Sequence, residues 1–394
     1  MSELRTQAFQ APPDVDRIQR VALALGGVAL LVALVGAVVD TEQFYRSYLL
    51  GYIFTLAIPM GCLGLLMIQH LTGGGWGMVT RRTLEAAVRT LPLMALLFVP
   101  IALGLSHLYE WTHAEIVATD RVLQWKAPYL NPTFFVIRAV FYFGLWTTMA
   151  LLLTKWSREQ DATGGDDWRL RLVSGPGILL FGLTITLASV DWVMSLDAHW
   201  YSTIFGLLFM VSEGLSALAF VILMTFFLSR TPEMSRVLTP KRFHDLGKLL
   251  LTFVMLYAYL AFSQFLLIWS ANLPEEVTYF LIRTRERWQW LSVLVIVGHF
   301  AFPFCLLLLR DLKRQANRLA MLAVIILAMR FLETYWLVVP NFRADQMSVH
   351  WLDVTVALGL VGLWLAAFCW NLKGRALLPV GDPYLEEALA DGHH

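Results

Sequence analysis

Four ionisable side chains lie deep inside the long apolar stretches in the second half of this 394-residue chain: two glutamates, a histidine and an arginine. At a rise of about 1.5 Å per residue, Glu213 and His299 lie about 16 Å from the N-terminal ends of their stretches. Arg330 lies about 12 Å from the C-terminal end of its stretch. Glu333 follows Arg330 by three residues, so the two share a helix face. An ionisable group at such a depth in a bilayer costs several kcal/mol unless it is paired or hydrated. We therefore expect these four residues to form one polar cluster.

Polar residues near both ends of the same stretches indicate how such a cluster would reach the two sides of a bilayer. The stretch DWVMSLDAHWYS (191–202) combines acids with an imidazole, and so does KRFHDLGK (241–248). Both residue types exchange protons readily. The residues that we expect to extend the cluster are Asp191, Asp197, His199 and Gln264 toward one side, and Tyr257, His244 and Asp245 toward the other.

Three interpretations of the cluster stay open from the residues alone. Glu213, Arg330 and Glu333 could form a buried ion-paired group that only holds helices together. They could instead line a proton path, or an ion or substrate transport site. The first two interpretations are compatible, because a hydrated ion-pair network can also carry protons. The stretch 191–202 suits proton release, a quinol head group or an ordinary polar turn, and 241–248 suits a solvated loop.

The composition makes the chain a polytopic membrane protein. Apolar residues make up 58% of it, charged residues 15%, and the mean hydropathy is +0.63. Soluble domains are about 45–50% apolar and about 25% charged. A soluble fold could not cover this much apolar surface with polar groups. The 30 basic residues balance 29 acidic ones, so no net field attracts a polyanion, and a nucleic-acid partner is excluded.

Ten stretches are long enough to cross a bilayer as helices, which takes about 20 mostly apolar residues. A β-barrel would instead need short alternating segments. The sequence therefore predicts an all-α integral membrane protein. Its ten predicted spans are 19–39, 46–69, 84–105, 132–154, 172–193, 202–228, 246–270, 288–309, 316–338 and 351–371.

The basic residues predict the orientation. The side that holds both termini and the loops after the even-numbered spans carries 21 Lys and Arg residues, against 7 on the other side. Basic residues concentrate on the cytoplasmic side of membrane proteins. We therefore expect a cytoplasmic tail at 1–18, a membrane domain at 19–371 and a second cytoplasmic tail at 372–394.

The sequence predicts no cofactor bound directly by this chain. Cys62, Cys305 and Cys369 lie far apart inside apolar runs, without haem-attachment or iron–sulfur spacing. Haem b needs two facing histidines, and His299 is the only histidine far from a predicted membrane interface. We therefore expect no haem, metal or flavin on the chain itself.

Several of these segments resemble the NrfD/polysulfide-reductase-like family of membrane subunits, and within it the F subunits of bacterial alternative complex III. The resemblance covers about residues 20–370. The segments that carry it are HLYEW (107–111), KAPYLNPTFFVIRAVFYF (126–143), DWVMSLDAHWYSTIFGLL (191–208), FHDLGKLLLTFVMLYAYLAFSQFLLIWSANLPEE (243–276) and RERWQW (285–290).

The resemblance implies two four-helix bundles, spans 2–5 and 6–9, flanked by spans 1 and 10. It implies a bacterial inner-membrane complex that oxidises menaquinol or another quinol and reduces a cytochrome c or another acceptor. Its partners would be a sister NrfD-like C subunit and multihaem cytochrome c and iron–sulfur subunits, which hold the haems and clusters. The polar cluster would lie in the second bundle as a proton path. The first bundle, with Arg138 as its only deep ionic residue, would be structural.

Two other functions stay open. The chain could be a quinol-binding membrane anchor in its own right, with a quinone head group near Asp197 and His199. It could also be a secondary transporter, a class that usually shows inverted repeats with broken helices. The prolines that interrupt its spans, Pro59, Pro92 and Pro100, do not lie at matched positions in the two halves, which disfavours the transporter.

Overall fold

The computed structural model describes residues 10–165, 168–373, 375–382 and 385. Within these ranges the chain is helical and contains no β-strand. The predicted tails at 1–18 and 372–394 fall partly outside these ranges, and His393 and His394 do so entirely.

Ten segments of the described chain are long and apolar enough to cross a membrane. The all-helical fold and the ten long apolar helices predicted from the sequence are therefore confirmed. The helices that build these segments are α2 (Asp14–Val39), α3 (Thr41–Thr72), α4 (Gly75–Val88) with α5 (Leu91–Leu97) and α6 (Val99–Leu103), α10 (Pro132–Thr163), α11 (Trp168–Trp192), α12 (Phe205–Leu228), α14 (Pro240–Ala271), α16 (Trp288–Val295) with η3 (Ile296–Ala301) and α17 (Phe302–Leu308), α19 (Ala316–Val338), and α20 (Trp351–Lys373).

Short helices connect or extend these segments. They are α7 (Leu105–Leu108), η1 (Glu110–Thr112), α8 (Ala114–Thr119), α9 (Arg121–Lys126), η2 (Met194–Leu196), α13 (Pro232–Ser235), α15 (Pro274–Arg283), α18 (Arg310–Arg314) and η4 (Val339–Asn341).

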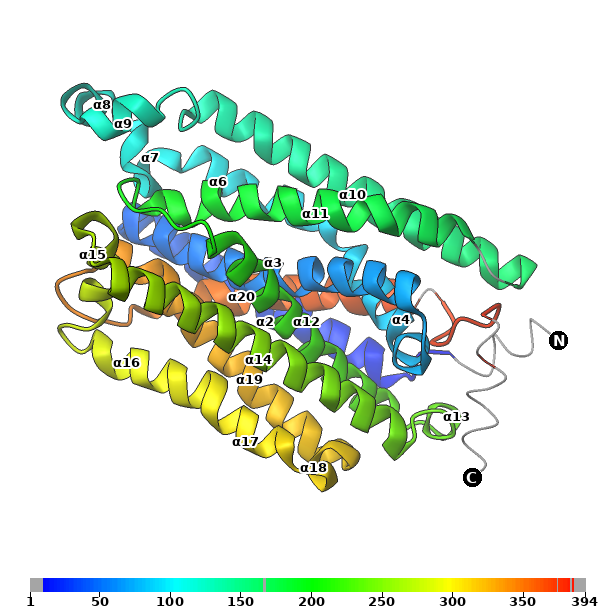
Figure 1. The fold of residues 1–394 in the computed structure, drawn as a ribbon. Coiled ribbons are helices and arrows are strands. Elements are labelled where there is room, and N and C mark those ends of the chain that lie inside the picture. The colour runs from blue at the N-terminus through cyan, green and yellow to red at the C-terminus, as the bar shows by residue number, and fades with distance from the viewer. Residues whose placement is uncertain (1–9, 166–167, 374, 383–384, 386–394) are drawn as a thin grey trace.

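The long helices run side by side and alternate in direction (Figure 1). Helix α2 begins and α20 ends at the same end of the molecule, where Lys373 forms an ion pair with Asp16. We call this the terminal end; α13 and α18 also lie there. Helices α8, α9 and α15 lie at the other end, which we call the opposite end (Figure 1).

Capping residues set where several long helices begin and stop. The side chains of Asp40 and Asn131 accept hydrogen bonds from the first turns of α3 and α10, at 3.0 and 2.9 Å. Such caps satisfy amides that have no partner within the helix. Helix α3 ends at Gly73 and α10 at Gly164, both with positive φ angles of 65° and 72°. A glycine adopts this conformation without the strain that a Cβ would cause.

Helix α3 lies at the centre of the molecule and is buried along nearly its whole length. It packs against α4, α11, α12 and α20, while α2 packs mainly on α20. The contact with α12 is especially close at Gly61. A Cβ atom there would lie 2.1 Å from the backbone oxygen of Glu213. Only a glycine fits at this crossing, so Gly61 sets the distance between α3 and the helix that carries Glu213.

Helix α12 also packs against α14 and α19, and α14 packs against α17 and α18. Helix α19 completes this group through contacts with α16 and η3. The four apolar segments that carry the predicted polar cluster are therefore neighbours.

The third apolar segment differs from its predicted span. It begins at Gly75 rather than at residue 84, and it is broken at Arg89 and Thr90, before Pro92. Arg81 and Arg82, which were expected in a loop, lie inside α4 and are buried. The physical reason is that the structure supplies these arginines with buried partners from other helices, described below.

We predict that Gly61→Ala destabilises the protein, because the added methyl group overlaps the backbone of α12. Overpacking of this kind typically costs about 1–3 kcal/mol. Gly144→Ala in α10 is the matched control, since a Cβ there meets nothing within 4 Å. Thermal unfolding in detergent should show a lower midpoint for Gly61→Ala and an unchanged or higher one for Gly144→Ala. Equal midpoints for the two variants would contradict the close crossing.

Candidate functional site

The structure brings five of the predicted polar residues together in the interior. Glu213 lies on α12, Tyr257 on α14, His299 in η3, and Arg330 and Glu333 on α19. Each of the five is at most 6% exposed. We call this group the polar cluster. All five lie within the long apolar segments, where water is scarce and charges must be compensated by the protein.

An ion pair forms the core of the polar cluster. Nη1 of Arg330 donates to Oε2 of Glu333 at 2.5 Å, and the hydroxyl of Tyr257 donates to Oε1 of Glu333 at 3.0 Å. Nε of Arg330 donates to the hydroxyl of Ser216 at 3.0 Å. Ser216 lies three residues after Glu213, on the same side of α12. These contacts join α12, α14 and α19 through one buried ion pair, with Arg330 binding α12 and Glu333 binding α14.

His299 lies against this ion pair in an unusual stretch of helix. Its ring meets the ring of Tyr257 edge-on, with centroids 4.4 Å apart and planes 71° apart. Residues Ile296–Ala301 form a π-helix, followed by Pro303. Proline has no amide hydrogen to donate to the carbonyl of the residue four positions earlier, which here is His299. Single π-helical turns within α-helices occur frequently at functional sites.

Glu213 and His299 differ from the rest of the polar cluster. Neither carboxylate oxygen of Glu213 and neither ring nitrogen of His299 has a hydrogen-bond partner among the described residues. Both side chains lie within electrostatic range of Arg330. A buried polar group without a partner costs about 1–3 kcal/mol. These two side chains therefore gain most from contact with water or from a change of protonation.

Gln264 lies two turns beyond Tyr257 on α14, toward the opposite end. It is buried, and its side-chain oxygen also has no partner in the described part of the chain. A spacing of seven residues keeps it on the same face of α14 as Tyr257. Gln264 therefore extends the polar lining of α14 in the expected direction.

Asp191 lies in a separate group, contrary to the expectation that it links the polar cluster to one side of the membrane. Its carboxylate binds Arg138 with two hydrogen bonds of 2.8 Å and accepts a third from Tyr142 at 3.0 Å. These partners lie on α10, and Asp191 lies on α11. The reason is geometric: α11 packs against α10, so the arginine nearest to Asp191 is Arg138. We expected Arg138 to be the only deep ionic residue of its half. That expectation is wrong, because Asp191 is buried beside it.

Asp197 and His199 lie in the turn between α11 and α12. Oδ1 of Asp197 accepts the backbone amides of His199 and Trp200, both at 3.2 Å. Nε2 of His199 lies 2.6 Å from Oδ2 of Asp120, the residue that caps α9. The backbone amide of Leu123 and the imidazole of His199 lower the pKa of Asp120. Oδ1 of Asp197 is engaged within the turn and Nε2 of His199 by Asp120 at the start of α9, so the geometry does not support a quinol head group between Asp197 and His199.

Arg283 is a functional candidate that the sequence analysis missed. It is buried at the end of α15, where its guanidinium lies 3.6 Å from the ring centre of Tyr279. It donates to the carbonyls of Trp336 and Leu337, at 3.1 and 3.0 Å, at the end of α19. Burial lowers the pKa of Arg283, and the charge of Asp197 opposes that effect. Arg283 therefore binds the end of the helix that carries Arg330, and it lies within electrostatic range of Asp197. The spacing of Tyr279 and Arg283, four residues apart on a short amphipathic helix, is the signal that could have indicated it.

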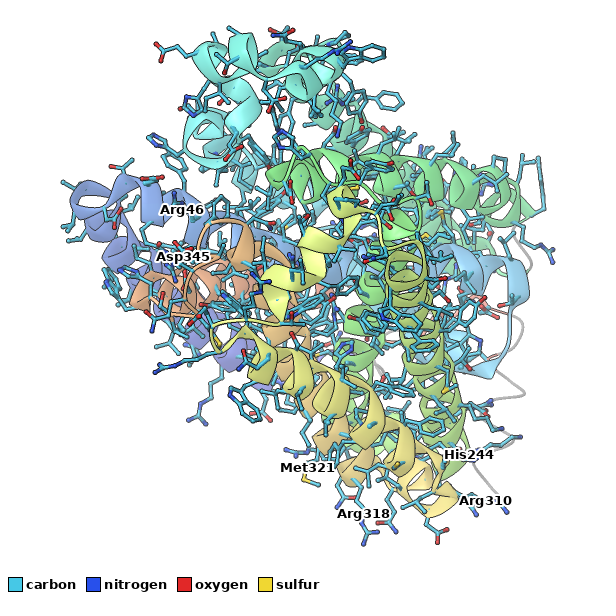
Figure 2. The ribbon with its side chains drawn as sticks, turned by 60° about the vertical axis from the view of Figure 1, so that its left-hand side comes forward. Arg46, His244, Arg310, Arg318, Met321 and Asp345 are labelled. Carbon is cyan, nitrogen blue, oxygen red and sulfur yellow. The ribbon has the colours of Figure 1, made fainter. Side chains whose placement is uncertain are left out.

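His244 and Asp245 lie at the terminal end, far from the polar cluster. Figure 2 shows His244 at the same end as Arg310. Asp245 forms an ion pair with Lys248 at 3.4 Å. Thirteen residues of α14 separate His244 from Tyr257, about 20 Å along the helix. No contact among the described side chains joins the two groups, so the expected connection on this side stays a prediction.

A second buried ionic network, also missed from the sequence, lies at the terminal end. Glu85 on α4 binds Arg81, Arg82 and Arg375. The spacing RRTLE places both arginines three and four residues before the glutamate, which is the helical signal for such pairs. The partner from the C-terminal segment has no such local signal.

No protein-family model matches the chain, and no curated protein is significantly similar to it. Within the described ranges, no three His, Cys, Asp or Glu side chains gather in a way that could hold a metal ion.

We predict that Glu333→Gln destabilises the protein strongly, because it leaves the buried Arg330 without its charged partner. Breaking a buried ion pair in this way costs about 3–5 kcal/mol. The matched control is Glu42→Gln, which removes the exposed pair between Glu42 and Arg46 on α3 and should cost less than about 1 kcal/mol. Unfolding midpoints in detergent measure both variants. Similar losses for the two would show that the Arg330–Glu333 pair does not stabilise the fold.

Proposed function

We propose that this chain is a membrane subunit of a quinol-oxidising electron-transfer complex of the alternative complex III type, corresponding to its F subunit. It has no redox centre of its own. The haems and iron–sulfur clusters lie in partner subunits, together with a sister NrfD-like C subunit. The segment resemblance described above supports the family, and the ten long apolar helices are consistent with it.

The proposed architecture is two four-helix bundles, spans 2–5 and 6–9, flanked by the first and last spans. Contacts of α12 with α14 and α19, and of α14 with α17, support the second bundle. Contacts of α3 with α4 and α11, and of α10 with α11, support the first. In the proposed orientation the terminal end faces the cytoplasm of a bacterium and the opposite end faces outward, in line with the bias of the basic residues.

The role we propose for the polar cluster is a proton path through the second bundle. The observation that carries this proposal is a charged network at membrane depth with two titratable members that lack partners. Arg330 and Glu333 hold the network in place, while Glu213 and His299 have no hydrogen bond within the described chain. On the outward side, the path that we propose would continue past Arg283, which binds two carbonyls at the end of α19, toward Asp197 in the turn before α12.

The composition of the complex purified by way of this chain tests its identity. We expect a tagged chain, extracted in mild detergent from its native membrane, to bring multihaem cytochrome and iron–sulfur subunits with it. The purified material should therefore show haem absorption that the chain alone lacks. A chain that purifies without redox partners would contradict the proposed function.

A Glu213→Gln variant of the complex tests the proton path. The substitution keeps the size of the side chain and removes its titrating group, so the complex should assemble and oxidise quinol while fewer protons cross the membrane per electron. Proton uptake and release by the complex in liposomes measure this ratio. Glu275→Gln, at an exposed position on α15, is the matched control and should leave the ratio unchanged.

Two results would contradict the proton path. An unchanged proton ratio in Glu213→Gln would show that this carboxyl group does not carry protons. A complex that assembles poorly, but whose remaining intact fraction keeps the normal ratio, would show that the polar cluster only holds the helices together.

A further inference from the structure

The terminal end carries more positive charge than its carboxylates compensate. Glu85 accepts from Arg82 at 2.6 Å, from Arg375 at 3.0 Å and from Arg81 at 3.2 Å. The hydroxyl of Ser157 donates to the same carboxylate at 2.5 Å. One buried carboxylate therefore faces three guanidinium groups.

Two further acids contribute to this network. Asp161 on α10 pairs with Arg82, and Asp382 in the C-terminal segment pairs with Arg81 at 3.1 Å. Two more arginines lie beside these groups, one directly after α4 and one on α10. Among the described residues, these five arginines thus face three carboxylates, which leaves an excess of two positive charges.

The two additional arginines, Arg89 and Arg158, form no ion pair or side-chain hydrogen bond with any residue of the described ranges. Arg89 is half-buried and Arg158 is exposed. Both lie close to Arg375. Burial lowers the pKa of Arg375 to about 10 against the attraction of Glu85, and the charges of Arg82, Arg89 and Arg158 act in the same direction as burial. Arg89 and Arg158 are therefore like charges close to Arg375, and Glu85 is the carboxylate that this group shares.

A small cavity opens at this point, between α4 and the end of α20. Its lining includes Arg82, Arg89 and Arg375, and its volume of about 10 Å³ is room for a single water molecule. The Nε atoms of Arg82 and Arg375 are buried there and have no partner among the described residues. An anionic group at the mouth of the cavity would meet Arg89, which lines it, while Arg158 lies within electrostatic range of Arg89 and Arg375. Water in the cavity could reach the two unpartnered donors.

The position of these arginines indicates the source of the anion. Arg89 follows the last residue of α4, Arg158 lies near the end of α10, and Arg375 follows the end of α20. All three helices belong to the apolar segments. On α10, Leu151 and Ile137 lie seven and twenty-one residues before Arg158, on the same helix face, and are 52% and 57% exposed. An apolar strip therefore continues from the guanidinium of Arg158 toward the middle of the bilayer. A lipid fits both parts, since its phosphate meets the arginines and its acyl chain covers the strip.

We propose that Arg89, Arg158 and Arg375 form a binding site for the phosphate of an anionic phospholipid headgroup. Arginine binds phosphate oxygens through paired, charge-assisted hydrogen bonds. Basic pockets between membrane helices bind anionic headgroups in the same way. The site goes beyond the proposed function and does not depend on it, because it requires only that the ten apolar helices lie in a bilayer.

Native mass spectrometry of the full chain in detergent tests this site, with phosphatidylglycerol and phosphatidylcholine as the added lipids. We expect tighter binding of phosphatidylglycerol to the unmodified chain. Each basic residue near a membrane surface strengthens the binding of an anionic lipid by about five-fold. Arg89→Gln combined with Arg158→Gln should therefore weaken phosphatidylglycerol binding by more than about ten-fold and leave phosphatidylcholine binding unchanged. Neither arginine has a partner to lose, so the variant should fold.

The matched control is Arg310→Gln combined with Arg318→Gln. These exposed arginines lie at the same end of the molecule, on α18 and at the start of α19 (Figure 2). The control should keep its preference for phosphatidylglycerol. An equal loss in both variants would show only a general effect of surface charge and would overturn the site.

Inorganic phosphate distinguishes a lipid from a free anion. We expect millimolar phosphate to compete weakly, because it lacks the acyl chain that the apolar strip of α10 accommodates. Phosphate that displaces phosphatidylglycerol fully at these concentrations would overturn the lipid assignment. An unmodified chain without preference for phosphatidylglycerol over phosphatidylcholine would overturn the site itself.

Discussion

Every charge inside these apolar helices must find its compensation within the protein, and the structure depends on that constraint. Three networks of ion pairs and hydrogen bonds compensate such charges, and each joins parts of the chain that are distant in sequence. Arg330 and Glu333 join α19 to α12 and α14. Arg138 and Asp191 join α10 to α11. Glu85 joins α4 to α10 and to the segment after α20. Because desolvated charges are costly when unpaired, each network restricts which helices can be neighbours.

The glycine at position 61 then allows α3 to pack closely against α12, so that the two halves of the molecule meet along the helix that carries Glu213.

Against this background, Glu213 and His299 are exceptions that need a reason. Both are buried, and neither has a hydrogen-bond partner within the described chain, although Ser216, Tyr257 and Glu333 nearby are all engaged. A side chain that served only to hold helices together would gain stability by forming a contact. Two titratable groups near a fixed positive charge, one of them in a π-helical stretch, instead favour a site where a proton or water moves. That is why we interpret the polar cluster as more than a structural ion pair.

The sequence predicted those features that depend on local composition. The ten apolar helices were predictable because span length and apolarity follow from adjacent residues. The pair of Arg330 and Glu333 was predictable because Glu333 follows Arg330 by three positions on one helix. Prediction from the sequence failed where the partner of a side chain is distant in the sequence. Arg81 and Arg82 look like loop residues until their remote partners Ser157, Asp161 and Asp382 are placed beside them. Asp191 was assigned to the wrong group because its partner depends on which helices pack together. The buried position of Arg283 and the π-helix around His299 likewise depend on tertiary packing, which no spacing pattern encodes.

The central claim is that Glu213 changes its protonation during turnover while Glu333 stays bound to Arg330. Infrared difference spectroscopy of the intact complex, between its oxidised and reduced states, observes carboxyl groups directly. The account predicts a carboxylic C=O band that shifts in heavy water, disappears in Glu213→Gln and persists in the exposed control Glu275→Gln. A difference spectrum without such a band, or one whose band is unchanged in Glu213→Gln, would contradict it.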